Sequence, residues 1–426
     1  MKKYNFNIIW ILIPILILLF GEISKSQTTF IVNKSHLDYL YEEINVDGKE
    51  MAIIHIYSNA PDYAYVGDDD EGYACIDDAA RAAIFYLEYY KAYLDSSSLN
   101  KFDKLIEFVL YMQAENGFFY NFIWEDHSIN MTFKTSVAEP NWWSWRALWV
   151  LMEGYKYFGY SNTEKTIAVR RSIEKIIEAI KPCIPKEKGK VLIDGIEFPD
   201  WLPANFASDQ AALLVISLSD YYKIFGDKVI LDYLQSLIHG IMIMQLNDSE
   251  CEYDGAFLSW QNTWHGWGNS QAYALLKAYQ VLKEEKIKTS ALLELNNFYE
   301  RLIEIGFLSY FKVKNNQDMY EVVESNKYSQ IAYCISPMVF ALLEAYNLTS
   351  DSTYAIKAGR VAQWFIGQNP ASTVMYNHHS GIFYDGIENE MLINKNSGAE
   401  STIEGLLSLL KISLNPVALT EFENID

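Results

Sequence analysis

The chain has 426 residues, a formal net charge of −21 and 21% charged residues. This charge excludes a nucleic-acid-binding function, because contact with phosphates requires a cationic surface. The length exceeds the usual ~100–200 residues of one domain, although helical toroids and barrels of this size fold as one unit. Four cysteines, Cys75, Cys183, Cys251 and Cys334, show no paired metal-ligand spacing, so no metal or other cofactor is predicted.

The first residues indicate export. Lys2 and Lys3 precede an apolar run from Ile8 to Phe20, and a polar stretch with small residues at Ser24 and Ser26 follows. This is the pattern of a secretory signal peptide, so we expect residues 1–26 to be removed and the mature protein to be periplasmic or extracellular. The run is shorter than the ~20 residues that span a bilayer, so no stable membrane span is expected; an uncleaved anchor is the alternative.

A short lead-in and a long helical region follow the signal peptide. In residues 27–66, short Ile, Val and Tyr runs such as Met51–Tyr57 are broken by turn residues, which predicts an irregular or β-containing segment. From residue 67 to residue 426 the pattern changes. Apolar residues then recur every three to four positions, as in Asp77–Leu94, and this is the period of one helical face.

About eleven helices are expected in residues 67–426. They cover Asp77–Leu94, Lys101–Gln113, Trp143–Phe158, Thr163–Ile180, Asp209–Phe225, Val229–Leu246, Ser270–Lys283, Ala291–Gly306, Ile331–Tyr346, Thr353–Ile366 and Ser401–Leu410. Strand signals are sparse, and short links alternate with long loops at 114–142, 181–208, 247–269, 307–330 and 367–400. Short links make antiparallel helix pairs, and long loops on the opposite side line one face. We therefore predict an all-α fold, an (α/α)6 toroid of helical hairpins, after the short lead-in.

Two groups of acidic residues surround the start of the first predicted toroid helix. Asp68–Glu71 is a run of four carboxylates, and Asp77 and Asp78 stand at the helix start. Neighbouring carboxylates repel one another, so some of them need a cation or a raised pKa, as catalytic acids often do. A helix N-cap at Asp77 and a first-turn position for Asp78 are the structural alternative. The candidate catalytic carboxylates here are Asp69, Asp70, Asp77 and Asp78.

Tryptophans gather in and just after the long loops. Trp142, Trp143, Trp264 and Trp267 stand beside Gly, Asn and His, a setting that a pure packing role does not explain. Indole rings suit the C–H faces of sugars, and their N–H groups reach hydroxyls. We therefore predict that this set contacts a carbohydrate. The predicted substrate-binding set is completed by Arg81, Asp209, His265 and Tyr376.

The C-terminal region carries a third group. A Gly-Gln-Asn-Pro segment at 367–370 is followed about thirty residues later by an Asn…Glu helix start. Ser397 or Asn396 can cap this last helix, with Glu400 as the capping-box acid. Glu404 lies one turn further along, on the same side of the helix. Glu400 is therefore a candidate catalytic acid with a structural alternative.

The layout of helical hairpins with aromatic loops resembles the six-hairpin glycosidases. The Gly-Gln-Asn-Pro segment with the later Asn…Glu helix start is similar to the end of glycoside hydrolase family 9 catalytic domains. This resemblance implies that Glu400 is the general acid and that an acid in the 68–78 region activates water. The Asp-Ala-Gly-Asp motif of family 9 is absent and its His-bearing motif is not evident. The resemblance therefore favours a different six-hairpin family.

These features predict an inverting glycoside hydrolase. Glu400 would protonate the leaving oxygen and an aspartate about 6.5–9.5 Å away would activate water on the opposite face of the sugar. The substrate is expected to be a neutral oligo- or polysaccharide, because the acidic chain and its scattered Lys and Arg disfavour an anionic glycan.

Two alternatives stay open at this point. A polysaccharide lyase or a sugar epimerase on a similar toroid would use His265 with Tyr273 or Tyr376 as base and acid. Such a lyase would also need a cation for the uronate carboxylate, and Arg81 and Arg146 are available near helix starts. The other alternative is a glycan-binding protein without catalytic activity.

Overall fold

The computed structural model describes residues 31–159, 163–317 and 319–424, so the predicted signal peptide lies outside the described residues. The lead-in begins with helix α2 (Ser35–Leu40), which is too short to have shown a helical period in the sequence. Two antiparallel hairpins follow. Strand β1 (Tyr41–Val46) pairs with β2 (Lys49–Ile54), and β3 (Tyr57–Asn59) pairs with β4 (Ala64–Val66).

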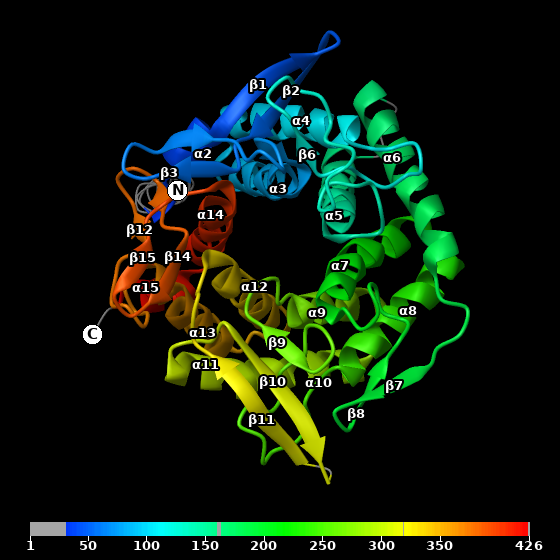
Figure 1. The fold of residues 1–426 in the computed structure, drawn as a ribbon, viewed down its shortest axis with the longest axis vertical. Coiled ribbons are helices and arrows are strands. Elements are labelled where there is room, and N and C mark those ends of the chain that lie inside the picture. The colour runs from blue at the N-terminus through cyan, green and yellow to red at the C-terminus, as the bar shows by residue number, and fades with distance from the viewer. Residues whose placement is uncertain (1–30, 160–162, 318, 425–426) are drawn as a thin grey trace, which may run out of the picture.

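The helices form a ring of hairpins around a central axis (Figure 1). Six inner helices contact one another in chain order, and the last of them contacts the first. The inner helices are α3 (Ile76–Tyr93), α5 (Trp142–Phe158), α7 (Ser208–Phe225), α9 (Gln271–Leu282), α12 (Ala332–Thr349) and α14 (Ala399–Ser413). The helices that pack outside them are α4 (Ser96–Tyr111), α6 (Glu164–Ile180), α8 (Lys228–Ile243), α10 (Glu285–Leu293), α11 (Tyr299–Ile305), α13 (Ser352–Ala362) and α15 (Pro416–Glu423). This cyclic order is the contact pattern that the predicted toroid requires.

Burial separates the inner helices from the outer ones. Of the 18 residues of α7, 13 are buried, whereas 7 of the 17 residues of α6 are buried. A helix with apolar residues all round must be covered on all sides, and one with a single apolar stripe can face water. The residue pattern of each helix therefore decides whether it lies in the inner or the outer layer.

Three of the short links between inner and outer helices share the same backbone and capping arrangement. A residue with left-handed backbone ends the inner helix, and an aspartate then caps the outer helix with its side chain. The three capping residues are Asp95, Asp227 and Asp351. Caps of this kind satisfy the free N–H groups of a helix start. They let the chain reverse within two residues, which makes each pair an antiparallel hairpin.

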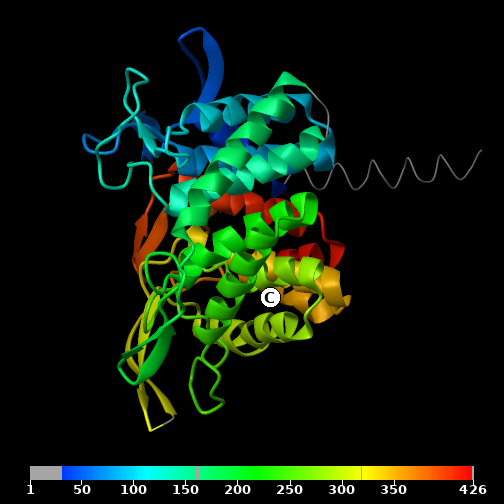
Figure 2. The same ribbon diagram turned by 90° about the vertical axis from the view of Figure 1, so that its right-hand side faces the viewer.

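The long connections gather on one side of the ring, called here the loop face (Figure 2). Each leads into the N-terminus of an inner helix, so the six inner N-termini point to this face. The connections hold the short strands β5 (Ala74–Cys75), β6 (Phe122–Ile123), β7 (Lys190–Ile193), β8 (Ile196–Pro199), β9 (Thr263–His265), β10 (Tyr310–Asn316), β11 (Met319–Asn326), β12 (Tyr376–Asn377), β13 (Ile382–Phe383), β14 (Gly386–Asn389) and β15 (Leu392–Asn394). The loop expected at 307–330 is thus the hairpin β10–β11. Its period-two signal, with Phe311 and Val313 buried, was present in the sequence.

Two helix predictions need correction. The helix expected at Ala291–Gly306 is divided into α10, a π-helical turn at Glu294–Phe298 and α11. Helix α15 was missed, although Asn415 caps it and Pro416 opens it, which is a recognisable helix start. Among the described residues no single helix is long and apolar enough to span a membrane; only α14 and α15 taken together are, and they meet at a bend of 113°.

The π-helical turn places a carboxyl group in the core. Glu294 is fully buried, and its Oε1 accepts a hydrogen bond of 3.0 Å from the backbone N–H of Phe257. Burial raises the pKa of Glu294 to about 8. A buried carboxyl that stays protonated avoids the cost of an unpaired charge. The neutral carboxyl group of Glu294 therefore connects the loop before α9 to the outer helices through this hydrogen bond.

We expect Glu294→Gln to stabilise the protein increasingly as the pH rises. The folded-state pKa lies above the value of an unfolded glutamate, so the wild type loses stability as the pH rises from about 4.5 towards about 8. The amide keeps the acceptor for Phe257 and carries no charge. Urea unfolding of both proteins at pH 5 and pH 8 measures the effect. A difference in unfolding free energy that does not grow between these pH values would contradict the buried neutral acid.

Candidate active site

The first turn of α3 presents two acids and, one turn later, an arginine. The N-cap is Cys75, whose Sγ accepts a hydrogen bond from the N–H of Asp78 at 3.4 Å. The predicted N-cap role of Asp77 is therefore wrong, and its carboxylate is available for other contacts. The spacing of four residues between Asp77 and Arg81 places both side chains on one side of the helix.

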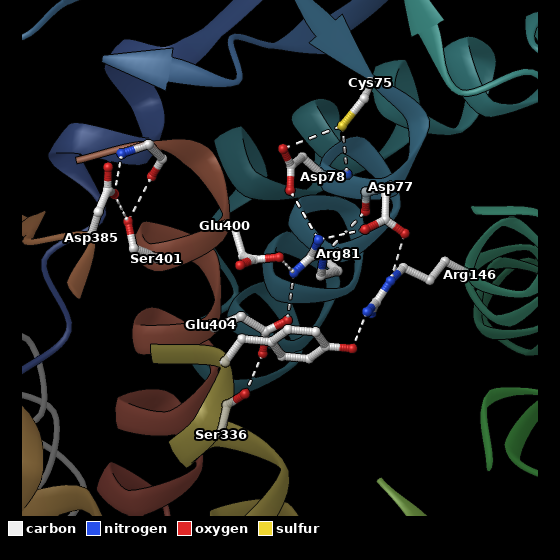
Figure 3. A network of polar contacts seen from close by, with 12 residues as sticks. Cys75, Asp77, Asp78, Arg81, Arg146, Ser336, Asp385, Glu400, Ser401 and Glu404 are labelled. Carbon is white, nitrogen blue, oxygen red and sulfur yellow. Dashed lines mark hydrogen bonds and ion pairs between the residues drawn. The ribbon is translucent and has the colours of Figure 1, made fainter. Parts of the chain in front are cut away.

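Arg81 forms ion pairs with four carboxylates (Figure 3). Its Nη2 lies 2.5 Å from Asp77 Oδ2 and 3.3 Å from Asp78 Oδ1. Its Nη1 lies 3.1 Å from Glu400 Oε2 and 3.1 Å from Glu404 Oε1. Only 5% of the Arg81 side chain is exposed. One buried guanidinium therefore joins the first inner helix to the last.

A second arginine supports the cluster from α5. Arg146 Nε lies 2.6 Å from Asp77 Oδ1 in an ion pair that lacks the alignment of a hydrogen bond. The Arg146 guanidinium also donates to the hydroxyl of Tyr333 on α12. The Tyr333 ring lies under both guanidiniums, 5.1 Å from that of Arg81 and 5.0 Å from that of Arg146. Ser336, also on α12, donates to Glu404. Four inner helices thus contribute to one network.

Glu400 does not act as a capping acid. The N-cap of α14 is Gly398, and its N–H donates to Asp385 Oδ1 at 2.8 Å, as the hydroxyl of Ser401 does at 2.5 Å. Burial raises the pKa of Asp385. The expected cap at Ser397 or Asn396 is therefore wrong, because a carboxylate from the preceding connection takes that role. This leaves Glu400 free to reach Arg81.

Exposure separates the four carboxylates into two pairs. The side chains of Asp78 and Glu404 are 5% and 4% exposed, whereas those of Asp77 and Glu400 are 19% and 42% exposed. The second pair is therefore more accessible to solvent than the first. The two oxygens that bind opposite ends of the Arg81 guanidinium lie no more than about 8 Å apart, because both contacts are short and the fork is rigid.

The buried acid behind this pair is uncharged over part of the neutral range. Burial raises the pKa of Asp78 to about 7; the Arg81 charge opposes this rise, and the Asp77 and Glu400 charges add to it. The Cys75 thiol donates to the same carboxyl at 3.3 Å. Four carboxyls face two guanidiniums here, so the cluster favours retaining a proton.

The other candidate acids lie apart from this cluster. Asp69 and Asp70 are exposed in the turn between β4 and β5, where Asp68 accepts hydrogen bonds from the N–H groups of Asp70 and Glu71. Within the described ranges, no hydrogen bond or ion pair joins Asp69 or Asp70 to Arg81. The run of four acids is therefore a solvent-exposed turn that is stabilised by the Asp68 side chain.

Three of the aromatic candidates belong to the core. Trp264 is 2% exposed and stacks on Phe311, because β9 pairs with β10 at these two residues. Trp143 is buried and donates from its indole to the carbonyls of Phe119 and Val137. Tyr376 is buried, with its hydroxyl bonded to residues 31 and 33. Their predicted contact with substrate is therefore not supported, since packing and backbone bonds occupy them.

The remaining candidates are Trp142, Asp209, His265 and Trp267. His265 Nε2 lies 3.0 Å from Asp209 Oδ2, and the His265 ring stacks on Trp267. A Cβ added at Gly268 would lie 3.1 Å from the Tyr333 hydroxyl and 3.3 Å from the half-buried Trp142 ring. The backbone that follows Trp267 therefore runs against the edge of the Arg81 cluster. Among the described residues, no group of three or more His, Cys, Asp or Glu side chains could hold a metal ion.

Sequence reasoning missed several members of the network. Tyr333, Ser336 and Asp385 were not singled out, and Arg146 was considered only for a lyase. The available signal was the presence of Arg81 and Arg146 near the starts of two otherwise apolar helices. A buried arginine requires carboxylate partners.

No protein-family model matches the chain, and no curated protein matches its sequence. Solved structures do match. A sugar epimerase from a ruminal bacterium superimposes with a TM-score of 0.60 at 12% identity, over 91% of this chain and 98% of the other. A D-mannose isomerase matches with a TM-score of 0.58 at 12% identity, over 94% and 97%. A family 76 glycoside hydrolase from a bovine Bacteroides thetaiotaomicron strain matches with a TM-score of 0.55 at 11% identity, over 91% and 78%.

At these identities the likeness concerns the fold alone. The three matching structures are enzymes named for action on sugars or glycosides. The chain therefore shares their ring of helical hairpins, which agrees with the sequence-based fold. The likeness singles out neither family 9 nor any other family.

We expect Arg81→Gln to destabilise the fold by about 3–5 kcal/mol at pH 7, because it leaves buried carboxylates without their cation. The loss should shrink as the pH falls and the carboxyls become protonated. Arg170→Gln is the control, since that arginine pairs with Glu174 on the surface, and we expect no measurable change there. Denaturant unfolding measures both variants. Equal stabilities for the two would show that Arg81 does not hold the ring together.

Proposed function

We propose that the protein is a glycoside hydrolase that cleaves a neutral glycan at the loop face of the ring. The observation that carries this proposal is the pair Asp77 and Glu400, two partly exposed carboxylates held at opposite ends of the Arg81 guanidinium. Hydrolysis of a glycosidic bond needs two carboxyls, one to protonate the leaving oxygen and one to assist the attack. The pair meets this requirement in a partly dehydrated setting.

The surroundings of the two carboxylates suggest their roles. Asp77 faces two guanidiniums, from Arg81 and Arg146, whereas Glu400 faces one. Glu400 is also the more accessible of the two, with 42% of its side chain exposed against 19% for Asp77, so we assign it the proton that passes to the glycosidic oxygen. Asp77 would accept a proton from the water whose oxygen attacks the anomeric carbon. The bond to the leaving group breaks as the bond to water forms.

The spacing and charge of the site bear on two finer features. The limit of about 8 Å between the two oxygens admits both the ~6.5–9.5 Å spacing of inverting enzymes and the ~5–5.5 Å spacing of retaining enzymes, so the inverting course is a prediction that the product anomer tests. Both arginines already face carboxylates, so neither is available to a uronate or sulfate group. A neutral glycan fits this site and the net charge of −21.

A sugar epimerase is the second candidate, because the matching structures include a sugar epimerase and a D-mannose isomerase. Epimerisation through proton transfer at carbon needs a base with a free lone pair. Both ring nitrogens of His265 face oxygen acceptors, and the hydroxyl of Tyr376 is bonded to backbone. The pair His265 with Tyr376 is therefore engaged in contacts within the protein, which supports hydrolysis over this version of the epimerase or lyase; the version with Tyr273 stays an alternative.

Replacing Glu400 with Gln, or Asp77 with Asn, should lower hydrolysis by about 10²–10⁴-fold while leaving glycan binding largely intact. The measurement is reducing-sugar release over a panel of neutral oligosaccharides, with NMR of the first product anomer. Glu388→Gln, an exposed acid on β14 of the same face, is the matched control and should keep full activity.

The same panel of oligosaccharides distinguishes a hydrolase from an epimerase, a lyase and a binding protein without activity. Incubation in D2O would place deuterium on a sugar carbon for an epimerase and not for a hydrolase. Unsaturated sugar products would indicate a lyase. Hydrolysis that persists in both carboxyl variants would overturn the assignment, and glycan binding without turnover in the wild type would indicate a binding protein.

A further inference from the structure

Trp267 lies flat against His265. The ring centroids are 4.2 Å apart and the ring planes differ by 9°. Trp267 is nevertheless 41% exposed, which is unusual for so large an apolar side chain. One part of the indole is covered by a planar polar group, and the rest is open to a ligand.

His265 is fixed in place by bonds at both ring nitrogens. Nδ1 lies 2.7 Å from the carbonyl of Trp267, and Nε2 lies 3.0 Å from Asp209 Oδ2. Asp209 is itself buried in the first turn of α7, where its Oδ1 accepts from the N–H of Gln210 at 2.6 Å. Each ring nitrogen of His265 therefore lies within hydrogen-bond distance of an oxygen of the protein, and the two contacts fix the orientation of the imidazole ring.

Two glycines allow the backbone on either side of Trp267 to pack closely against α12. A Cβ at Gly266 would lie 2.9 Å from Cys334 Sγ, so only glycine fits between His265 and Trp267. Gly268 has a φ of +71° and passes against Tyr333, the ring that lies under both guanidiniums. The backbone on both sides of Trp267 thus packs against α12, and one of the residues that it meets there, Tyr333, also contacts both guanidiniums.

We propose that His265 is a positioning residue that holds Trp267 as a stacking platform for one sugar ring of the substrate. The proposal rests on the proposed function, and it assigns His265 to binding rather than to proton transfer. Sugars that present a face of C–H groups suit an indole surface of this kind, whereas their hydroxyls lie around the ring edge. The ligand class is a neutral pyranoside.

The test separates binding from turnover in a set of variants. Trp267→Ala should raise the dissociation constant of the best neutral oligosaccharide by at least about tenfold, because an aromatic contact with the sugar is lost. His265→Gln should raise the dissociation constant by about three- to tenfold and leave kcat within about threefold of the wild-type value. Trp260→Ala is the matched control, because Trp260 is 44% exposed on the same connection, and it should leave both quantities unchanged.

A double variant keeps the test valid if His265→Gln folds poorly. His265→Phe with Asp209→Asn retains a flat ring beneath Trp267 and removes the buried charge. We expect it to bind the glycan more tightly than His265→Gln does. The fluorescence of Trp267 is the part of the protein's emission that is lost in Trp267→Phe. Acrylamide should quench this emission more strongly in His265→Gln than in the wild type, because the indole is more exposed there. This result does not depend on the activity of the variant.

Results that would overturn the role of His265 and Trp267 differ from results that would overturn the proposed hydrolase function. A kcat that falls by about 10²–10⁴-fold in His265→Gln at unchanged binding would make His265 a proton-transfer group and overturn the inference. Wild-type binding in Trp267→Ala, or no binding of any neutral glycan by the wild type, would overturn it as well. Loss of hydrolysis in the Glu400 and Asp77 variants is measured separately, so either proposal can fail alone.

Discussion

The contact of Arg81 with four carboxylates is the interaction on which the rest of the site depends. Asp77 and Asp78 come from the first inner helix, and Glu400 and Glu404 come from the last, more than 300 residues later in the chain. The guanidinium therefore forms part of the closure of the ring and also fixes the spacing of the exposed pair. A buried cation surrounded by acids costs desolvation, which is offset only while every partner is present. Under the proposed function, stability and activity would therefore both depend on Arg81.

The direction of the inner helices explains why acids gather at this face. All six inner helices point their N-termini towards the long connections, and the positive end of a helix dipole favours negative charge. Asp77, Asp78, Asp209 and Glu400 all lie in first turns. The helix ends that stabilise these carboxylates also direct them towards the loop face, so a structural role and the proposed catalytic role are compatible. Cys75 and Asp385 take the nearby capping and anchoring roles.

The helical ring could be predicted from the sequence because its signals are local. Apolar periods and alternating link lengths identified nearly every helix of the ring. Tertiary partners could not be read in this way. Trp264 and Tyr376 resemble loop aromatics in sequence, and their burial depends on Phe311 and on the lead-in, respectively. The Arg81 cluster likewise joins residues 319 positions apart, and no local pattern links Asp77 with Glu400.

A crystal structure of the Glu400→Gln variant with its best neutral oligosaccharide would test the account most directly. The account predicts a sugar chain across the loop face, with one ring stacked on Trp267. It also places a glycosidic oxygen within about 2.6–3.2 Å of the residue 400 side chain, and Asp77 on the opposite side of the scissile sugar. A chain bound elsewhere on the ring, or bound here with neither residue near the glycosidic bond, would contradict it.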